Sequence, residues 1–68
     1  MREAEIIRQR RKELGLPQME VALEIGISLR AYQRFEYGQR KLSKASFELG
    51  LKLCLILEIN PYELIEFD

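Results

Sequence analysis

The segment at positions 18–38 reads QMEVALEIGISLRAYQRFEYG, and the interpretation of the whole chain depends on it. Apolar residues recur at helical spacing on both sides of Gly26, which can adopt a positive φ that other residues reach only with strain. Ser28 follows and can accept a hydrogen bond from a backbone N–H of the next turn. The segment therefore predicts two short helices, about 18–25 and 29–37, joined by a sharp turn.

The two predicted helices differ in what they present outward. Val21, Ala22 and Ile25 form the buried stripe of the first helix, and Tyr32 and Phe35 form the inner face of the second. Four side chains of the second helix remain for its outer face: Leu29, Arg30, Gln33 and Arg34. A helix with arginines on its exposed face is suited to an anionic partner.

Before this segment, the apolar spacing predicts a helix over 3–14, which Gly15 ends as a C-terminal cap. Leu16 and Pro17 form the connection to the next helix. Pro17 suits a helix start because its fixed φ is already helical and its missing N–H would have no partner there.

After Gly38 the chain is harder to interpret. Positions 39–44, QRKLSK, are predicted to be a basic loop, and Ser43 or Ser46 is the candidate N-cap of the next helix. Apolar residues then alternate strictly over 47–59, which is a strand pattern, although Leu, Lys, Glu and Cys are poor strand formers. We favour a helix and keep a strand as the alternative.

A helix at 47–59 would carry more apolar surface than one face can bury. Leu51 and Leu55 are left on the outer side, and we expect them to meet a second copy of the chain or a partner protein. Further on, Asn60 as N-cap and Glu63 reaching back as in a capping box predict a short fifth helix. It is expected to end near Glu66. Phe67 follows, and its ring is assigned to the same dimer or partner surface as the two leucines.

Composition restricts the chemistry of the chain. Its 68 residues allow one domain, 1–68, and the 47% hydrophobic content fits a globular fold. Cys54 is the only cysteine and there is no histidine, so an intramolecular disulfide and the common zinc frameworks are excluded. Cys54 lies among leucines and is interpreted as a small buried apolar residue. We expect no metal and no cofactor.

Two broad classes of protein are disfavoured. No uncharged apolar run of about 18 residues and no secretion signal are present, so we expect no membrane partner and predict a cytoplasmic protein. Without histidine, a second cysteine or clustered carboxylates, the chain lacks the usual groups for general acid–base or nucleophilic catalysis. We therefore predict that it is not an enzyme.

The net charge of zero conceals an uneven distribution of charge. Residues 1–44 contain ten Lys or Arg against six Glu, a balance of +4. Residues 45–68 contain one Lys against five acidic residues, a balance of −4. Such a distribution lets one surface attract phosphate while the other repels it.

Several motifs occur in a fixed order along the chain. They are R-x-x-x-G-L-x-Q from Arg11, V-A-x-x-x-G-I-S from Val21, F-E-x-G from Phe35, and I-N-P-Y-E-L-I at 59–65. Together they resemble the helix-turn-helix family of phage repressors and Cro proteins, also called the XRE family. The resemblance implies an all-α, five-helix, lambda-repressor-like domain with the helix-turn-helix at its second and third helices.

The resemblance also implies roles for individual residues, because the third helix of that family enters the major groove of DNA. The residues that would read base edges are Leu29, Arg30, Gln33 and Arg34. The residues that would contact phosphates are Gln18, Tyr37, Gln39, Arg40, Lys41 and Lys44. Arg11 and Glu36 match positions that form a structural ion pair. Arg30 or Arg34 would pair with a guanine, Leu29 could lie against a thymine methyl group, and the alternative for the arginines is a solvated surface role.

Two features depart from the family pattern. Pro17 replaces the usual Ser or Thr cap, so the first turn of the second helix loses a side-chain acceptor. Residues 39–46 are about one turn longer than in compact members, which leaves the half-site spacing open.

The sequence leaves three candidate functions. The first is a sequence-specific transcriptional regulator, a repressor that binds a palindromic operator in double-stranded DNA as a homodimer. The second is an antitoxin-like module that holds a partner protein, such as a toxin, and autoregulates its operon. The third is a domain that makes only protein contacts.

Overall fold

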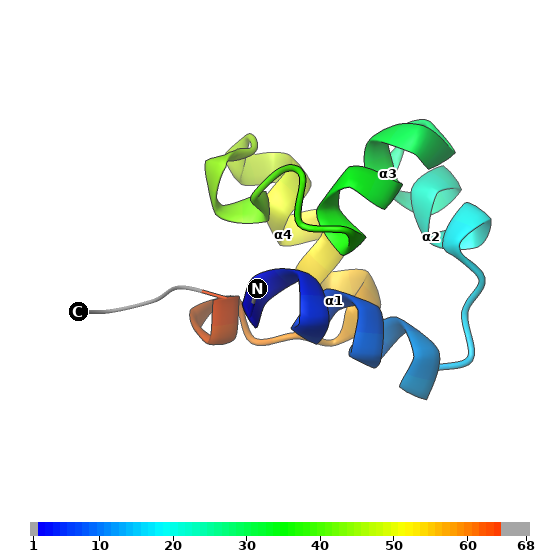
Figure 1. Cartoon of the computed structure of the whole chain (residues 1–68), viewed down its shortest axis with the longest axis horizontal. Coiled ribbons are helices and arrows are strands. Elements are labelled where there is room, and N and C mark those ends of the chain that lie inside the picture. The colour runs from blue at the N-terminus through cyan, green and yellow to red at the C-terminus, as the bar shows by residue number, and fades with distance from the viewer. Residues whose placement is uncertain (1, 65–68) are drawn as a thin grey trace.

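The computed structural model describes residues 2–64, and these residues form four α-helices and two 3₁₀ turns (Figure 1). The elements in chain order are α1 (Arg2–Glu13), α2 (Gln18–Ile25), α3 (Leu29–Glu36), η1 (Leu42–Lys44), α4 (Phe47–Leu57) and η2 (Pro61–Leu64). No strand occurs between residues 2 and 64, so the all-α prediction is confirmed. The segment that alternates like a strand is the helix α4, as favoured from its residue types.

The predicted turn between α2 and α3 is present. Gly26 has φ 80° and its N–H donates to the carbonyl oxygens of Ala22 and Leu23, which closes α2. The Ser28 hydroxyl accepts from the N–H of Ala31 at 3.1 Å and caps α3. The two local signals read from the sequence therefore set the end of α2 and the start of α3.

The last element differs from the predicted fifth helix. Asn60 Oδ1 accepts from the N–H of Tyr62 at 3.0 Å, and Glu63 Oε2 accepts from the N–H of Asn60 at 3.2 Å, as in a capping box. The Glu63 N–H bonds to the Asn60 carbonyl, three residues back, so the turn is 3₁₀. Four α-helices, not five, lie within residues 2–64. The predicted end near Glu66, and Phe67, fall outside the described residues.

The interior is a single cluster of mostly aliphatic side chains from all four helices. Ile7, Val21, Tyr32, Phe35, Leu53 and Leu57 are fully buried. Figure 1 shows α2 and α3 side by side at one end of the molecule and the start of α1 beside η2 at the other. The buried stripes predicted for the two short helices are the ones that pack in this core.

The segment 39–44 is not a simple basic loop, because it ends in the 3₁₀ turn η1. Leu42 is buried, and its N–H donates to the carboxylate of Glu3, which also accepts from the Ser43 N–H at 3.3 Å. Buried backbone N–H groups need a partner, and Glu3 supplies it from the first turn of α1. This contact holds the segment that follows α3 against the first turn of α1.

The cap of α4 is Ser46, whose hydroxyl accepts from the Leu49 N–H at 3.2 Å. At the other end Glu58 adopts φ 56°, in the left-handed region that glycine usually occupies at helix C-termini. No helix within residues 2–64 has the length and apolar character needed to cross a membrane.

Candidate nucleic-acid interface

The outer face of α3 carries two free cations. Arg30 and Arg34 are exposed, and neither side chain forms an ion pair or hydrogen bond with any of residues 2–64. Leu29 and Gln33 lie beside them and are partly buried. The four residues predicted to read base edges are therefore on one side of α3, with the arginines most accessible.

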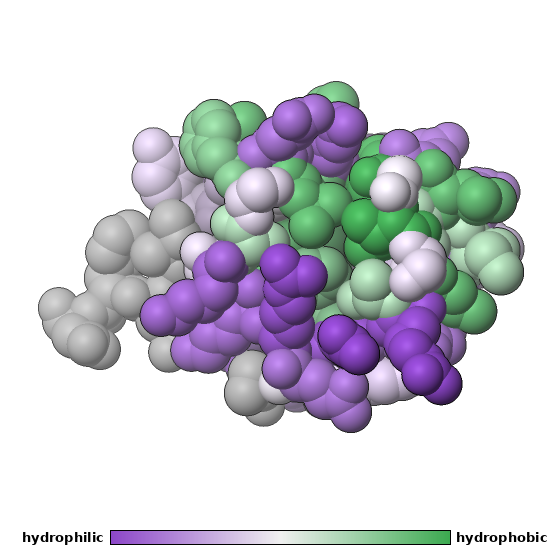
Figure 2. All heavy atoms as spheres, turned by 90° about the horizontal axis from the view of Figure 1, so that it is seen from above, coloured by the Kyte–Doolittle hydropathy of each residue, from purple (hydrophilic) through white to green (hydrophobic). Residues whose placement is uncertain are grey.

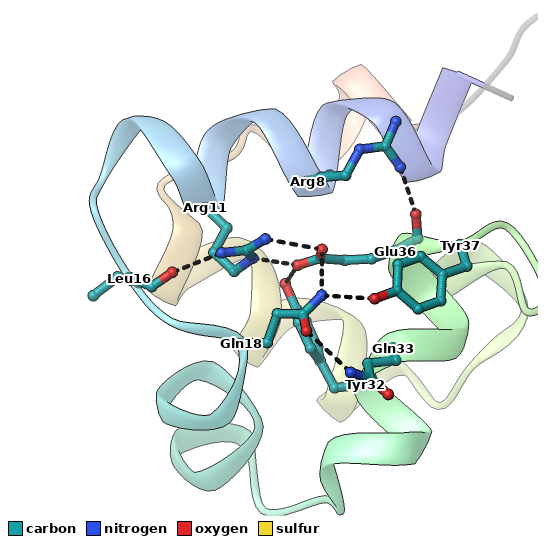
Figure 3. Close-up of polar contacts among 8 residues, drawn as sticks. All are labelled: Arg8, Arg11, Leu16, Gln18, Tyr32, Gln33, Glu36 and Tyr37. Carbon is teal, nitrogen blue, oxygen red and sulfur yellow. Dashed lines mark hydrogen bonds and ion pairs between the residues drawn. The ribbon is translucent and has the colours of Figure 1, made fainter.

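Behind this face, α3 is anchored by the carboxylate of Glu36, which is fully buried (Figure 3). Arg11 donates to it through Nε at 2.5 Å and through Nη2 at 3.2 Å, so α1 and α3 are joined by a bidentate ion pair. The Tyr32 hydroxyl, one turn back on α3, donates to the same carboxylate. Gln18 Nε2 donates to it from the start of α2 at 3.0 Å. We call Glu36 and these three donors the Glu36 cluster.

The Glu36 cluster has a defined charge state. Burial opposes ionisation of Glu36 and is the largest single influence, but the hydrogen bonds from Arg11, Tyr32 and Gln18 together outweigh it and hold the pKa of the carboxyl below its usual range. Burial, followed by the bond to Glu36, raises the pKa of the Tyr32 hydroxyl far above its ordinary value. Glu36 is therefore an anion that only accepts, and Tyr32 is a neutral donor.

Two arginines of α1 extend the same junction through backbone carbonyls. Arg8 Nη1 donates to the Glu36 carbonyl at 2.8 Å, at the C-terminal end of α3 where carbonyls lack helical partners. Arg11 Nη1 donates to the Leu16 carbonyl at 2.8 Å in the α1–α2 connection. These two bonds tie the C-terminal end of α3 and the α1–α2 connection to α1.

Gln18, expected to contact a phosphate, is occupied inside the protein. Its Nε2 donates to Glu36 and to the Tyr37 hydroxyl, the latter at 3.3 Å, and its Oε1 accepts from Gln33 Nε2 at 3.0 Å. A side-chain amide has only two N–H donors, so both are used. Pro17 provides no side-chain cap to α2, as the sequence indicated.

The residues expected to contact phosphates beyond α3 are all exposed. They are Tyr37, Gln39, Arg40, Lys41 and Lys44. The Arg40 guanidinium lies over the Phe35 ring, 5.2 Å from its centroid, which limits the directions in which it can point. The rest of this basic segment is held in place by η1 and Glu3.

Sequence reasoning missed three members of this interface. The Tyr32 hydroxyl, the Arg8 contact and the Glu3 carboxylate were not assigned any role. Arg8 is one helical turn before Arg11, so the periodicity of α1 could have indicated it. The other two have no local signal, because their partners are set by how α3 and η1 pack.

A second surface lies on α4. Leu51 and Leu55, placed on the outer side by the sequence, are 43% and 80% exposed, and Phe47 is 82% exposed. A hollow of about 360 Å³ beside them is lined by Leu42, Phe47, Gly50, Leu51, Cys54 and Leu64, among others. Figure 2, which looks onto the side with α3 and η1, shows hydrophobic surface next to a hydrophilic edge. We call Phe47, Leu51 and Leu55 the α4 apolar face.

A short exposed helix that is braced by a second one and followed by a basic segment defines a helix-turn-helix DNA-binding domain. The model of the Helix-turn-helix family (HTH_3), which covers Cro-type or XRE regulators, matches residues 7–64. The chain belongs to this family, so it is a DNA-binding transcriptional regulator. No curated protein and no solved structure matched the chain in the corresponding comparisons.

Proposed function

We propose that the protein is a repressor that binds a palindromic operator as a homodimer, with α3 in the major groove. The observation that supports this most directly is the contrast between the two sides of α3. Its inner side is fixed by the Glu36 cluster, whereas Arg30 and Arg34 on its outer side have no partner among residues 2–64. A rigid helix with free guanidinium groups is what direct readout of guanine requires.

Base reading is assigned to the four side chains on the outer face. Arg30 and Arg34 can each donate two N–H groups to guanine O6 and N7. Leu29 offers no hydrogen bond and is suited to the methyl group of a thymine. The bond of Gln33 to Gln18 inside the protein restricts which base Gln33 can read.

Phosphate contacts are assigned to the segment that follows α3. Arg40, Lys41 and Lys44 are exposed cations, and Gln39 is an exposed amide. They are suited to contacts with the sugar-phosphate backbone of DNA, which carries charge but no sequence information. Gln18 would act on a phosphate indirectly. Its Nε2 donates to the oxygen of Tyr37, which leaves the exposed hydroxyl proton of Tyr37 to point elsewhere.

Dimerisation is assigned to the α4 apolar face. A monomer rarely keeps several large apolar side chains exposed together, and a two-fold dimer would cover the same face on both copies. Two copies of α3 would then meet two half-sites, which accounts for a palindromic operator. A dimer seated on a promoter excludes polymerase, which gives repression.

The first experiment is selection of duplexes from a random DNA library at moderate salt, with sequencing of the bound pool. An inverted repeat with guanines in each half-site supports the dimeric repressor. A single half-site without symmetry would refute the dimer. No enrichment from protein shown to be folded would refute sequence-specific binding by the free protein.

An antitoxin-like module is the second candidate, because the α4 apolar face lies in the acidic half of the chain. Residues 45–68 carry a net charge of −4, which suits a basic partner protein better than DNA. The mass of the free protein in solution distinguishes the two candidates. A dimer favours the repressor, whereas a monomer that remains monomeric at high concentration favours the module.

A further inference from the structure

We propose that Gln33 reads an adenine and that Glu36 is a positioning residue, which fixes the amide of Gln33 for this purpose through Gln18. The inference rests on the proposed operator binding. It adds the class of base that one side chain reads and the reason for its selectivity.

The charge of the Glu36 carboxylate determines which end of the Gln18 amide faces it. Ionised Glu36 has no proton to give and can only accept hydrogen bonds. Gln18 lies 3.0 Å from Glu36 Oε1, so the group that faces the carboxylate must be its NH₂ and not its carbonyl oxygen. The orientation of the Gln18 amide is therefore dictated by Glu36.

The orientation of the Gln18 amide in turn orients the amide of Gln33 on α3. With its NH₂ toward Glu36, Gln18 turns Oε1 toward Gln33, and an oxygen can only accept. Gln33 must then present its own NH₂, and Nε2 lies 3.0 Å from Gln18 Oε1. Figure 3 shows the carbonyl oxygen of Gln33 turned away from Gln18. Rotation of the Gln33 amide by half a turn would place two oxygens against each other.

Gln33 keeps two hydrogen-bonding groups with which it can contact DNA. One of its two N–H groups is committed to Gln18, so one N–H and the carbonyl oxygen remain. Adenine presents an acceptor, N7, next to a donor, N6–H, and this pair matches them. Guanine presents two acceptors, which a glutamine with a free NH₂ could satisfy with both N–H groups. Gln33 cannot do so while it is held by Gln18, and the contact therefore discriminates against guanine.

The position of Gln33 on the helix allows this role. It lies between Arg30 and Arg34 in sequence and is partly buried at the edge of the outer face. The arginines are assigned to guanines, so the adenine is expected within the same half-site as these guanines.

The test compares binding of the full chain to the selected site and to sites that differ at one base pair. We expect one position per half-site at which adenine is preferred about tenfold or more over guanine. Gln33→Leu should remove the preference at that position and leave the other positions unchanged. Gln33→Glu should move it toward cytosine, because a carboxylate accepts from cytosine N4 but cannot donate to adenine N7. Both changes are at a partly exposed position and should leave the protein folded.

Gln18→Met tests the positioning role, because it interrupts the relay and leaves Gln33 itself intact. We expect adenine-over-guanine selectivity to fall several-fold at the Gln33 position, with affinity for the adenine site reduced less than that selectivity. Thermal melting of the variant ensures that the comparison is made on folded protein. An equal loss of affinity for all sites, with selectivity unchanged, would show that Gln18 is only structural and would overturn the relay.

These outcomes separate the inference from the proposed function. If wild-type protein selects no site, operator binding by the free protein fails. If it selects a site whose base preferences are all unchanged by Gln33→Leu, operator binding stands and the adenine assignment is wrong.

Discussion

The Glu36 cluster and the α4 apolar face use buried and exposed surface in opposite ways. In the cluster, a fully buried carboxylate is surrounded by donors, and no buried side-chain polar atom among residues 2–64 lacks a partner. On α4, by contrast, Leu55 is 80% exposed and Phe47 is 82% exposed. The first region is complete within one copy of the chain, whereas the second is the face that we propose a second copy covers.

The difference shows how such a small chain divides two tasks. Reading a base needs side chains held in one geometry, and directional hydrogen bonds to a buried charge supply that geometry. Association needs apolar surface that can be removed from water. This driving force is not directional, so it does not require one exact geometry. Substitutions in either region test this division.

Arg11→Ala should have the largest effect, because it leaves the buried Glu36 carboxylate without its ion-pair partner. A loss of about 3–5 kcal/mol in the free energy of unfolding is expected for a buried pair broken in this way. Urea unfolding measures it. The preferred DNA site should not change, and an unchanged melting temperature with a shifted site would contradict the structural role of the pair.

Acid should reduce the stability that the Glu36 cluster gives to the fold. An unfolded glutamate titrates near pH 4.3, about the value for model peptides, and the pKa of Glu36 in the folded protein is lower. Its contribution to stability is therefore complete above the unfolded pKa and is lost as the pH falls through the folded pKa. Urea unfolding between neutral and acid pH should show a smaller acid-induced loss for Glu36→Gln than for the wild type. Equal losses in the two proteins would mean that Glu36 does not contribute.

Leu55→Glu should dissociate the proposed dimer. Burial of a leucine side chain is worth about 1.5–3 kcal/mol, and a two-fold dimer would bury the substituted face of both copies. Sedimentation over a range of concentrations measures the change in association. Leu23→Glu is the matched control, because Leu23 is 71% exposed but lies on α2, outside the α4 apolar face. Both variants should unfold like the wild type, and dissociation by the control alone would move the interface to α2.

Arg34→Ala should weaken discrimination at one base pair of each half-site. The expected loss is about 1–3 kcal/mol for the correct base and little for the others, because one bidentate contact disappears. Competition binding against single-base variants of the selected site measures it. A uniform loss at every position would mean that Arg34 contacts phosphate and not a base.

Lys41→Ala should have the smallest effect, spread evenly over all sequences. Removal of one phosphate contact should flatten the slope of log K against log salt by about one unit. Titrations at several salt concentrations measure this slope for the selected site and for random DNA. A change confined to the selected site would place Lys41 at a base edge.

The parts of the fold that were predictable from the sequence are those with local signals. Gly26, Ser28 and Ser46 each act within one turn of their own position, so α2 and α3 could be placed from residue types, and the start of α4 was narrowed to two candidates, Ser43 and Ser46. Glu58 could not be recognised in this way, because helices that end in the left-handed conformation usually have glycine or asparagine there.

The candidate site was predictable only in outline. The exposed face of α3 follows from helical periodicity, and the Arg11–Glu36 pair followed only from the family resemblance. The bonds of Gln18 to Glu36 and Gln33 link residues 18 and 15 positions apart, and that of Glu3 to Leu42 spans 39. Such contacts depend on how the helices cross, which no window of sequence contains.

The single cysteine makes the α4 region measurable without any added label. Cys54 is 5% exposed, lines the hollow beside Leu51, and has a thiol whose pKa is raised by burial. Because the chain has no other thiol, its rate of reaction with a disulfide reagent records how often this one place opens to solvent. If this rate falls as the protein concentration rises, the reactivity of Cys54 reports association of the wild-type protein.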